Sequence, residues 1–226
     1  MREIAADKTG CYELSESGWQ RIQVMSELTG RLATLLPTTG PPALMLSGAL
    51  MHRVRGIDPA QDTERKLAPL GQLQGRRVLD TATGLGYTAI EAARRGGAVV
   101  TVELDPAVVE VQRRNPWSTE LFEHALIDRR VCDVTEVIDE LGDGEFDAIL
   151  HDPPVIDLAG DLYGRSFYQQ LLRVLKPGRC LFHYVGNPES PSGARTMRGV
   201  VDRLREVGFA DVKRENSAFG LSAHRP

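Results

Sequence analysis

Residues Val78 to Thr88 read Val-Leu-Asp-Thr-Ala-Thr-Gly-Leu-Gly-Tyr-Thr, and they decide how the rest of the chain is interpreted. The stretch predicts a buried strand that ends at Asp80 and runs into a turn with Gly84 and Gly86. A helical pattern, Ala89–Arg95, follows directly. A strand, a glycine turn and a helix in this order form a nucleotide-type pocket at the carboxyl edge of a parallel sheet. The two glycines let the backbone approach a ligand where a side chain would block it.

Asp80 indicates which nucleotide the pocket binds. A carboxylate just before the turn predicts a negative group at the mouth of the pocket, which repels a pyrophosphate and attracts a cationic amine. S-adenosylmethionine (SAM) carries an ammonium and a sulfonium and has no phosphate, so it is the predicted ligand. The glycine pattern alone also fits the dinucleotide fingerprint, with Ala89 in the third position. Glu103, which ends the next predicted strand, would bind the ribose hydroxyls in either case.

Length and charge narrow the range of partners. The chain has 226 residues, which suits one domain with a small appendage. Its hydrophobic content of 42% and charged content of 26% are ordinary for a soluble globular protein. A formal net charge of −4 argues against a broad phosphate-binding surface. We therefore expect a small-molecule substrate and no nucleic-acid partner.

Targeting and metal signals are absent from the sequence pattern. No apolar run approaches the length of a membrane span, and Met1–Lys8 is too polar for a signal peptide. We therefore expect a cytoplasmic protein without a membrane partner. Cys11, Cys132 and Cys180 are isolated and lack metal-ligand spacing, so no metal site is predicted.

The first 66 residues predict a small N-terminal module. Apolar residues at helical spacing predict a helix over Gly18–Leu36, and Pro37 ends it. Residues Ala43–Val54 predict a β-hairpin with its turn at Ser47-Gly48. A module of one helix and one hairpin is too small to be stable alone. We expect it to pack on the main domain, over the ligand end of the sheet.

Residues 67–226 alternate between strand and helix patterns, which predicts an α/β, Rossmann-like, doubly wound and mostly parallel sheet. Only Asn216-Ser217 separates the last two strands, so they must form a C-terminal antiparallel hairpin. The seven predicted strands are Arg77–Thr81, Val99–Glu103, Arg129–Cys132, Ala148–His151, Cys180–Tyr184, Asp211–Glu215 and Ala218–Ala223.

The residues around the predicted strand ends form a candidate SAM site. Asp80 and the glycine turn would hold the methionine part and Glu103 the ribose. Asp133, after the third strand, would accept from the adenine amine, or cap the helix that begins at Val134. The predicted SAM-binding residues are Asp80, Thr81, Gly84, Gly86, Tyr87, Thr88, Glu103, Asp133 and Asp152.

His151-Asp152-Pro153-Pro154 ends the fourth strand, where catalytic groups lie in such sheets. The two prolines stiffen the loop and remove backbone donors. His183 and Tyr184 end the neighbouring strand, so both histidines are expected to face one cleft, where either would deprotonate a nucleophile. The alternative is that each is a satisfied core residue. The predicted catalytic residues are Asp152, His151, His183 and Tyr184.

Further residues are candidates for substrate binding. Arg53 would clamp a carboxylate of the substrate or of SAM, and Tyr163 would stabilise a sulfonium through its ring. Around Arg53, the residues His52, Asp58, Asp62 and Lys66 form a polar cluster, and the favoured interpretation of its acidic members is a solvated interdomain salt-bridge patch. The predicted substrate-binding residues are Arg53, Pro153, Pro154, Tyr163 and Asn187.

These motifs resemble the class I SAM-dependent methyltransferases. More narrowly, the chain is similar to a group of predicted methyltransferases, best represented in archaea, with a His-Asp-Pro-Pro motif. In that group a basic residue usually follows the double proline, whereas Val155 stands here. Spermidine synthases are a remoter likeness, and their Gly-Gly-Gly-Asp-Gly turn is absent. The resemblance rests on Met51-His-Arg, Asp58-Pro, Asp62-Thr, Leu79–Ala92, Asn115-Pro-Trp-Ser, His151-Asp-Pro-Pro, Leu158–Tyr163 and Phe182–Pro188.

The resemblance implies a SAM-dependent transferase, and three functions stay open. The first is methyl transfer to a small molecule held near Asp152. The second is cyclisation of SAM itself to azetidine-2-carboxylate and methylthioadenosine, as in azetidine-2-carboxylate synthases. The third is a sensor or scaffold that binds SAM without catalysis. The sequence leaves a homodimer open.

Overall fold

A computed structural model describes residue 7 and residues 9–226, so most of the polar stretch Met1–Lys8 lies outside the described residues. A seven-stranded sheet forms the centre, in the order β12-β13-β11-β10-β7-β8-β9. The five strands from β7 to β11 are parallel, and β13 is antiparallel to both of its neighbours. This confirms the predicted sheet. Its strands are β7 (Arg77–Asp80), β8 (Ala98–Glu103), β9 (Ile127–Val131), β10 (Phe146–His151), β11 (Leu175–Tyr184), β12 (Ala210–Glu215) and β13 (Gly220–His224).

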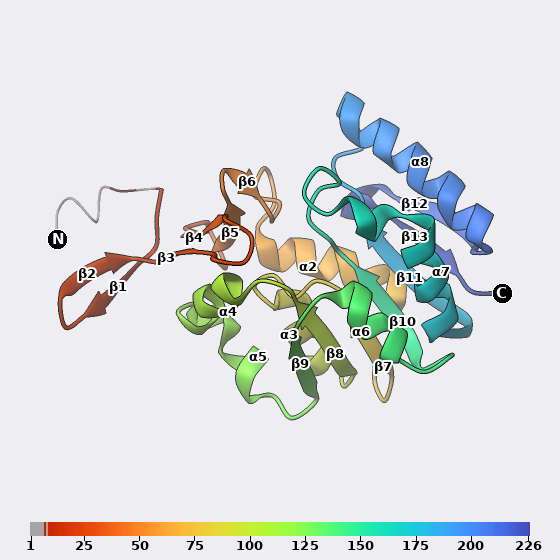
Figure 1. Ribbon diagram of the computed structural model, residues 1–226, viewed down its shortest axis with the longest axis horizontal. Coiled ribbons are helices and arrows are strands. Elements are labelled where there is room, and N and C mark those ends of the chain that lie inside the picture. The colour runs from red at the N-terminus through yellow and green to blue at the C-terminus, as the bar shows by residue number, and fades with distance from the viewer. Residues whose placement is uncertain (1–6, 8) are drawn as a thin grey trace.

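Helices cover both faces of this sheet (Figure 1). Successive strand residues point to opposite faces, so Val78 packs in one core cluster and Leu79 in the other. The Val78 face is covered by α2 (Pro59–Leu67), α3 (Tyr87–Arg94) and the short α5 (Thr119–Glu123). The Leu79 face is covered by α6 (Val134–Glu140), α7 (Arg165–Val174) and α8 (Pro191–Val207).

The helix predicted over Gly18–Leu36 is wrong. This segment forms β2 (Gly18–Arg21), β3 (Gln23–Met25) and β4 (Leu32–Leu36). Its apolar residues do not share one face, because Ile22 and Leu35 are buried while Met25 and Leu28 are exposed. Gly30 adopts a φ of 64°, which lets the chain reverse between β3 and β4.

The hairpin predicted at Ser47-Gly48 is present, as β5 (Ala43–Leu46) and β6 (Ala49–Leu50). Both turn residues have positive φ, at 45° and 89°, as a tight two-residue hairpin requires. With β3 and β4 they form a four-stranded sheet in the order β3-β4-β5-β6. Side chains of this sheet share a core cluster with Leu85, Tyr87 and α4 (Pro106–Arg113). The domain boundary at residue 66 stays a prediction, and α2 spans it.

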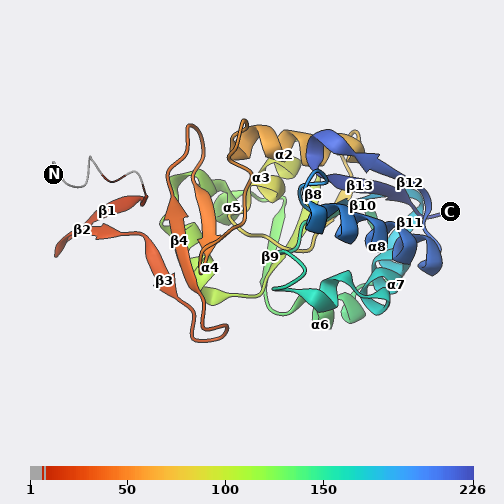
Figure 2. The ribbon, with the colours of Figure 1, turned by 90° about the horizontal axis from the view of Figure 1, so that it is seen from above.

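A separate hairpin precedes that sheet. Strand β1 (Tyr12–Ser15) pairs antiparallel with β2, and Figures 1 and 2 show this hairpin extending away from the body of the molecule. Across residue 7 and residues 9–226, no helix combines the length and the apolar character needed to cross a bilayer.

Candidate functional site

A cavity of about 350 Å³ lies between the carboxyl ends of the parallel strands and the N-terminal sheet. Its volume is at the lower end of the range for small-molecule sites. The N-terminal sheet contributes apolar wall residues, among them Leu44 and Leu46. Of the predicted site residues, those that line the cavity are Thr81, Gly84, Tyr87, Thr88, Glu103, Asp133, Asp152, Pro153, Pro154 and Tyr184.

The two glycines of the turn have different roles. Both have positive φ, 54° at Gly84 and 80° at Gly86. A Cβ on Gly84 would meet no atom within 4 Å, and this residue lines the cavity. A Cβ on Gly86 would lie 2.6 Å from Cδ2 of Leu121. Gly84 therefore keeps the backbone open to a ligand, whereas Gly86 lets the start of α3 pack against α5.

Glu103 occupies one backbone donor of the glycine turn, the amide of Gly84. Its Oε2 accepts from the Gly84 amide at 2.9 Å, and its Oε1 accepts from the Asp105 amide at 3.0 Å. Burial raises the pKa of this carboxyl to about 7, although the two backbone donors oppose the shift. In dinucleotide-binding folds the amides at this turn face a pyrophosphate. Here a carboxylate takes that place, so the turn does not suit a phosphate.

Asp80 does not lie at the mouth of the cavity, where it was predicted to be. Its side chain is buried and does not line the cavity. Its Oδ2 accepts from the hydroxyls of Thr88 and Thr101, each at 3.1 Å. Within the described part of the chain, its buried Oδ1 has no hydrogen-bond partner. Burial, reinforced by the nearby Asp152, raises the pKa of Asp80 to about 7.

Asp133 has the predicted capping role, and its contact with an adenine amine stays a prediction. It caps α6 by accepting from the Thr135 amide at 2.8 Å and from the Thr135 hydroxyl at 2.7 Å. It also lines the cavity. A capping carboxylate has a fixed orientation, so an oxygen of Asp133 is held ready for a donor on a ligand.

His151 and His183 lie together, with ring centroids 4.3 Å apart, but they are fully buried and do not line the cavity. His151 donates from Nε2 to the Leu162 carbonyl at 2.9 Å, and its Nδ1 contacts the Thr81 hydroxyl at 2.7 Å. His183 donates from Nδ1 to the His151 carbonyl at 3.2 Å, and its Nε2 contacts the Tyr168 hydroxyl at 2.9 Å.

Burial lowers the pKa of His151 to about 3 and holds the pKa of His183 well below its ordinary value. Both rings are therefore neutral at pH 7, with both nitrogens occupied. The expectation that they face one cleft is wrong, because the rings turn into the core below the strand ends. They position the strand ends and do not reach a ligand in the cavity.

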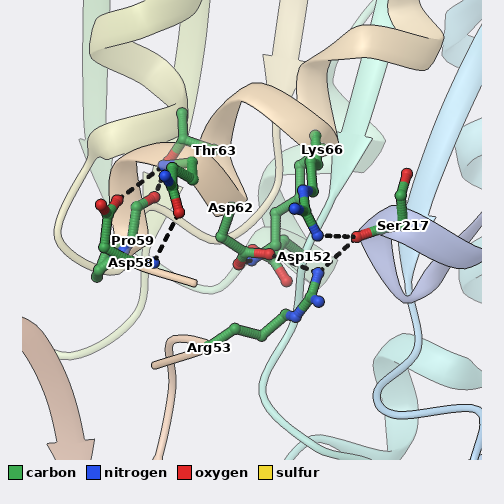
Figure 3. Close-up of polar contacts among 10 residues, drawn as sticks. Arg53, Asp58, Pro59, Asp62, Thr63, Lys66, Asp152 and Ser217 are labelled. Atoms are coloured by element: carbon green, nitrogen blue, oxygen red, sulfur yellow. Dashed lines mark hydrogen bonds and ion pairs between the residues drawn. The ribbon is translucent and has the colours of Figure 1, made fainter. Parts of the chain in front are cut away.

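A buried ion-pair network forms where α2 meets the end of β10 (Figure 3). Lys66 Nζ lies 2.6 Å from Asp152 Oδ2 and 3.0 Å from Asp62 Oδ2. Arg53 Nη1 lies 3.0 Å from Asp62 Oδ1 and donates to the Ser217 carbonyl at 2.7 Å. Two cations and two carboxylates thus neutralise one another.

The network also fixes the protonation of its members. Burial alone would lower the pKa of Lys66, but the carboxylates of Asp152 and Asp62 outweigh it and raise that pKa. Burial raises the pKa of Asp152, and the Lys66 ammonium opposes that shift. Lys66 Nζ also lies 4.5 Å from the centre of the Tyr184 ring, where the ring face attracts a cation.

Three of the predicted substrate-binding residues do not line the cavity. Arg53 belongs to the ion-pair network and stacks on Phe219, with its guanidinium carbon 3.6 Å from the ring centre. Tyr163 donates its hydroxyl to the Pro154 carbonyl at 3.1 Å, so it braces the double-proline loop. Asn187 accepts from the Glu189 amide at 2.9 Å, in the segment before α8.

Several lining residues lie outside the predicted site list: Arg31, His52, Asp62, Lys66 and Asp161. Lys66 and Asp62 are four residues apart on α2, and the start of this helix is recognisable in the sequence. Asp58 caps it, Pro59 begins it, and Gln61 completes the capping box. No comparable sequence pattern indicates that Arg31 reaches the cavity, because it lies in the segment that was wrongly predicted to be helical.

The lining favours a cationic ligand. Five carboxylate residues face two cationic side chains, Arg31 and Lys66. His52 adds no charge, because burial, aided by Lys66, lowers its pKa to about 3. The residues present could therefore hold an adenosyl sulfonium, with Glu103 at the ribose hydroxyls, Asp133 at the adenine amine and the open space beside Gly84 for the amino-acid tail.

Comparison with known proteins gives relatives of the same fold. The chain is 47% identical over 193 residues to an uncharacterized protein of Methanocaldococcus jannaschii, which covers 85% of this chain and 66% of that protein. It is 31% identical over 176 residues to polyamine aminopropyltransferase 2 of Streptomyces coelicolor, over 74% of this chain and 30% of the relative. The chain thus spans about two thirds of the first relative and less than a third of the second.

A solved structure of spermidine synthase in complex with the transition-state analogue AdoDATO superimposes with a TM-score of 0.74. It is 16% identical and covers 100% of this chain and 85% of that one, and this likeness shows the fold alone. The fold is therefore that of the SAM-methyltransferase and spermidine-synthase group. A family model matches residues 65–181, just over half of the chain, and the protein belongs to that family, described as conserved hypothetical protein 95.

Proposed function

We propose that this protein binds SAM and transfers its methyl group to a small-molecule acceptor. The observation that carries the proposal is the contact between Glu103 and the Gly84 amide, at 2.9 Å, inside a cavity whose lining has more acidic than basic side chains. A carboxylate at the glycine turn excludes a pyrophosphate and supports a nucleoside whose charge is positive.

Asp152 is the residue best placed to hold the acceptor. Its Oδ2 is occupied by Lys66, while no described residue donates a hydrogen bond to its Oδ1. Asp152 lines the cavity beside Tyr184 and the two prolines of its loop. Such a site acts by aligning the attacking atom and by excluding water from it, and a misplacement of 1 Å costs about 100-fold in rate.

Aminopropyl transfer is a second candidate function, favoured by the aminopropyltransferase relatives and the spermidine-synthase fold. It would use decarboxylated SAM and an amine acceptor. The buried Lys66 counts against it, because an ammonium of the protein already occupies Asp62 and Asp152.

Product analysis distinguishes the candidates. The protein is incubated with SAM and a panel of metabolites, with SAM alone, and with decarboxylated SAM plus diamines. Adenosylhomocysteine that forms only with an acceptor supports methyl transfer. Methylthioadenosine from SAM alone indicates cyclisation, and methylthioadenosine from decarboxylated SAM with a diamine indicates aminopropyl transfer. Binding of SAM without any product across the panel would favour a sensor and contradict the proposal.

Asp152→Asn tests the acceptor site. We expect turnover to fall by about 100-fold or more, with SAM affinity changed far less, because the acceptor loses its alignment. Asp157→Asn is the matched control, since Asp157 is exposed on the same loop and does not line the cavity. Equal turnover in the two variants would remove Asp152 from the reacting site.

A further inference from the structure

The surroundings of Lys66 have the chemistry of an alkylammonium site. Two carboxylate oxygens, from Asp62 and Asp152, lie at 3.0 and 2.6 Å from Nζ. The face of Tyr184 lies 4.5 Å away. Carboxylates combined with an aromatic face are how proteins bind a primary or quaternary ammonium. Here the ammonium belongs to the protein itself.

Asp62, Asp152 and Tyr184 form a cage around the Lys66 ammonium, and the charges within it are already balanced. Asp62 is shared between Lys66 and Arg53, and Asp152 is paired with Lys66. The side chains of Lys66 and Asp62 are 4% and 1% exposed, so each depends on its partner for compensation of its charge. A free amine or diamine would have to displace Lys66 and leave it buried without a partner. The cage is therefore closed to cationic acceptors.

Lys66 retains one donor. An ammonium has three N–H groups, and two of them serve Asp62 and Asp152. Lys66 lines the cavity, so the third N–H is available to a group bound there. Because the charges of both carboxylates of the cage are already balanced, the group that suits this donor is an anionic oxygen.

The proposed site for the amino-acid tail of SAM lies beside this donor. The Thr81 amide donates to the Leu150 carbonyl at 3.1 Å, which joins the start of the glycine turn to the end of β10. Asp152, which binds Lys66, follows two residues after Leu150. The turn that would hold the tail and the Lys66 cage therefore meet at the ends of two neighbouring strands, β7 and β10.

We propose that Lys66 is a specificity-determining residue: it fills an amine cage from inside, excludes alkylammonium acceptors, and binds the α-carboxylate of SAM. This inference rests on the proposed function, because it requires a SAM-type sulfonium in the cavity. Decarboxylated SAM lacks the group that Lys66 binds, so the same lysine separates the methyl donor from the aminopropyl donor.

Calorimetry of the full chain with SAM and with decarboxylated SAM tests the donor preference. We expect the wild-type protein to bind SAM at least about tenfold more tightly, the difference of one charge-assisted hydrogen bond. In Lys66→Met this ratio should fall to near one. Arg65→Met is the control, because Arg65 is exposed and does not line the cavity, and it should keep the wild-type ratio.

A second measurement tests the cage without relying on SAM. Lys66→Ala leaves Asp62, Asp152 and Tyr184 around an empty volume that suits a short primary amine. We expect n-butylamine to raise the melting temperature of Lys66→Ala and to leave the wild-type protein unchanged. An equal response of the two proteins would contradict the proposal that Lys66 fills an amine-binding cage.

The outcomes separate this inference from the proposed function. If neither SAM nor decarboxylated SAM binds the wild-type protein, the proposed function fails. If both bind but the wild-type protein prefers decarboxylated SAM or does not discriminate, the role of Lys66 is overturned while a sulfonium site stands. An unchanged preference in a folded Lys66→Met overturns it as well.

Discussion

Asp80 links the stability of the fold to pH. Its carboxyl is buried, one of its oxygens has no partner among the described residues, and its pKa is raised from 3.8 to about 7, first by burial. The unfolded chain releases this proton near pH 4, whereas the folded chain holds it until about pH 7. Between these values folding requires the uptake of a proton by Asp80, so the contribution of this residue to stability declines as the pH rises.

We predict that Asp80→Asn removes this contribution, so that between about pH 5 and about pH 7 the free energy of unfolding of the ligand-free variant rises relative to that of the wild-type protein. The comparison of the two proteins is needed because other buried groups titrate in the same range. Glu103, with its raised pKa, acts in the same direction as Asp80, whereas the lowered pKa values of His52, His151 and His183 act in the opposite direction. Denaturant titrations of both proteins at several pH values measure the difference. The exposed Asp157→Asn should follow the wild-type slope, and an Asp80→Asn variant that does the same would contradict the assignment.

At the scale of elements, the turn between β7 and α3 combines a packing requirement with a binding requirement. Gly86→Ala is expected to destabilise the fold by about 1–3 kcal/mol, because its Cβ would clash with the buried Leu121 at a positive φ. Gly84→Ala carries the cost of its positive φ without a clash, so its main effect should be weaker SAM binding.

The two substitutions at this turn control for each other, because they make the same chemical change two residues apart. Thermal unfolding measures the first effect and calorimetry with SAM the second. The assignment would be wrong if Gly84→Ala bound SAM normally, or if Gly86→Ala were as stable as the wild-type protein.

Elements with local signals were predictable. The strands β7, β8 and β10 are apolar runs bounded by turns, and α3 and α4 have clear helical periodicity. The structure of the segment Gly18–Leu36 was not predictable, because its apolar spacing fits a helix. The turn at Gly30 instead lets β3 and β4 pair as strands. Pairing partners such as β4 and β5 stabilise strands through contacts that no local window contains.

At the scale of the whole molecule, the cavity joins two parts of the chain. The N-terminal sheet supplies Leu44 and Leu46, and the central sheet supplies Gly84 and Glu103. A ligand in this cavity contacts both walls, so its binding energy should stabilise both at once. At 100 times Kd this stabilisation amounts to about 2.7 kcal/mol.

Hydrogen exchange with and without SAM checks this expectation. We predict slower exchange both in β5 (Ala43–Leu46) and in the turn at Thr83–Gly86, with β12 at the far edge of the sheet as the internal reference. Protection confined to the turn would mean that the N-terminal sheet does not take part in the site.

The candidate site was predictable only as a set of strand ends. The sequence placed Glu103, Asp133 and Asp152 at the carboxyl edge of the sheet, and all three line the cavity. It placed His151 and His183 at the same edge with equal reason, yet both rings are buried beneath it. A position at a strand end is a local property, whereas the direction of a side chain depends on the helices packed around it.

From residue 67 on, the sequence by itself determined the order of strands and helices, the glycine turn and the acidic residues at the strand ends, because periodicity and turn chemistry act over a few neighbouring residues. Only the tertiary structure decided which of these residues reach a ligand. It brought Lys66 to Asp152 across 86 residues of chain, buried Asp80, and put Glu103 on the amide of Gly84. These contacts join elements that are distant in the sequence, so they exist only once the sheets and helices have packed.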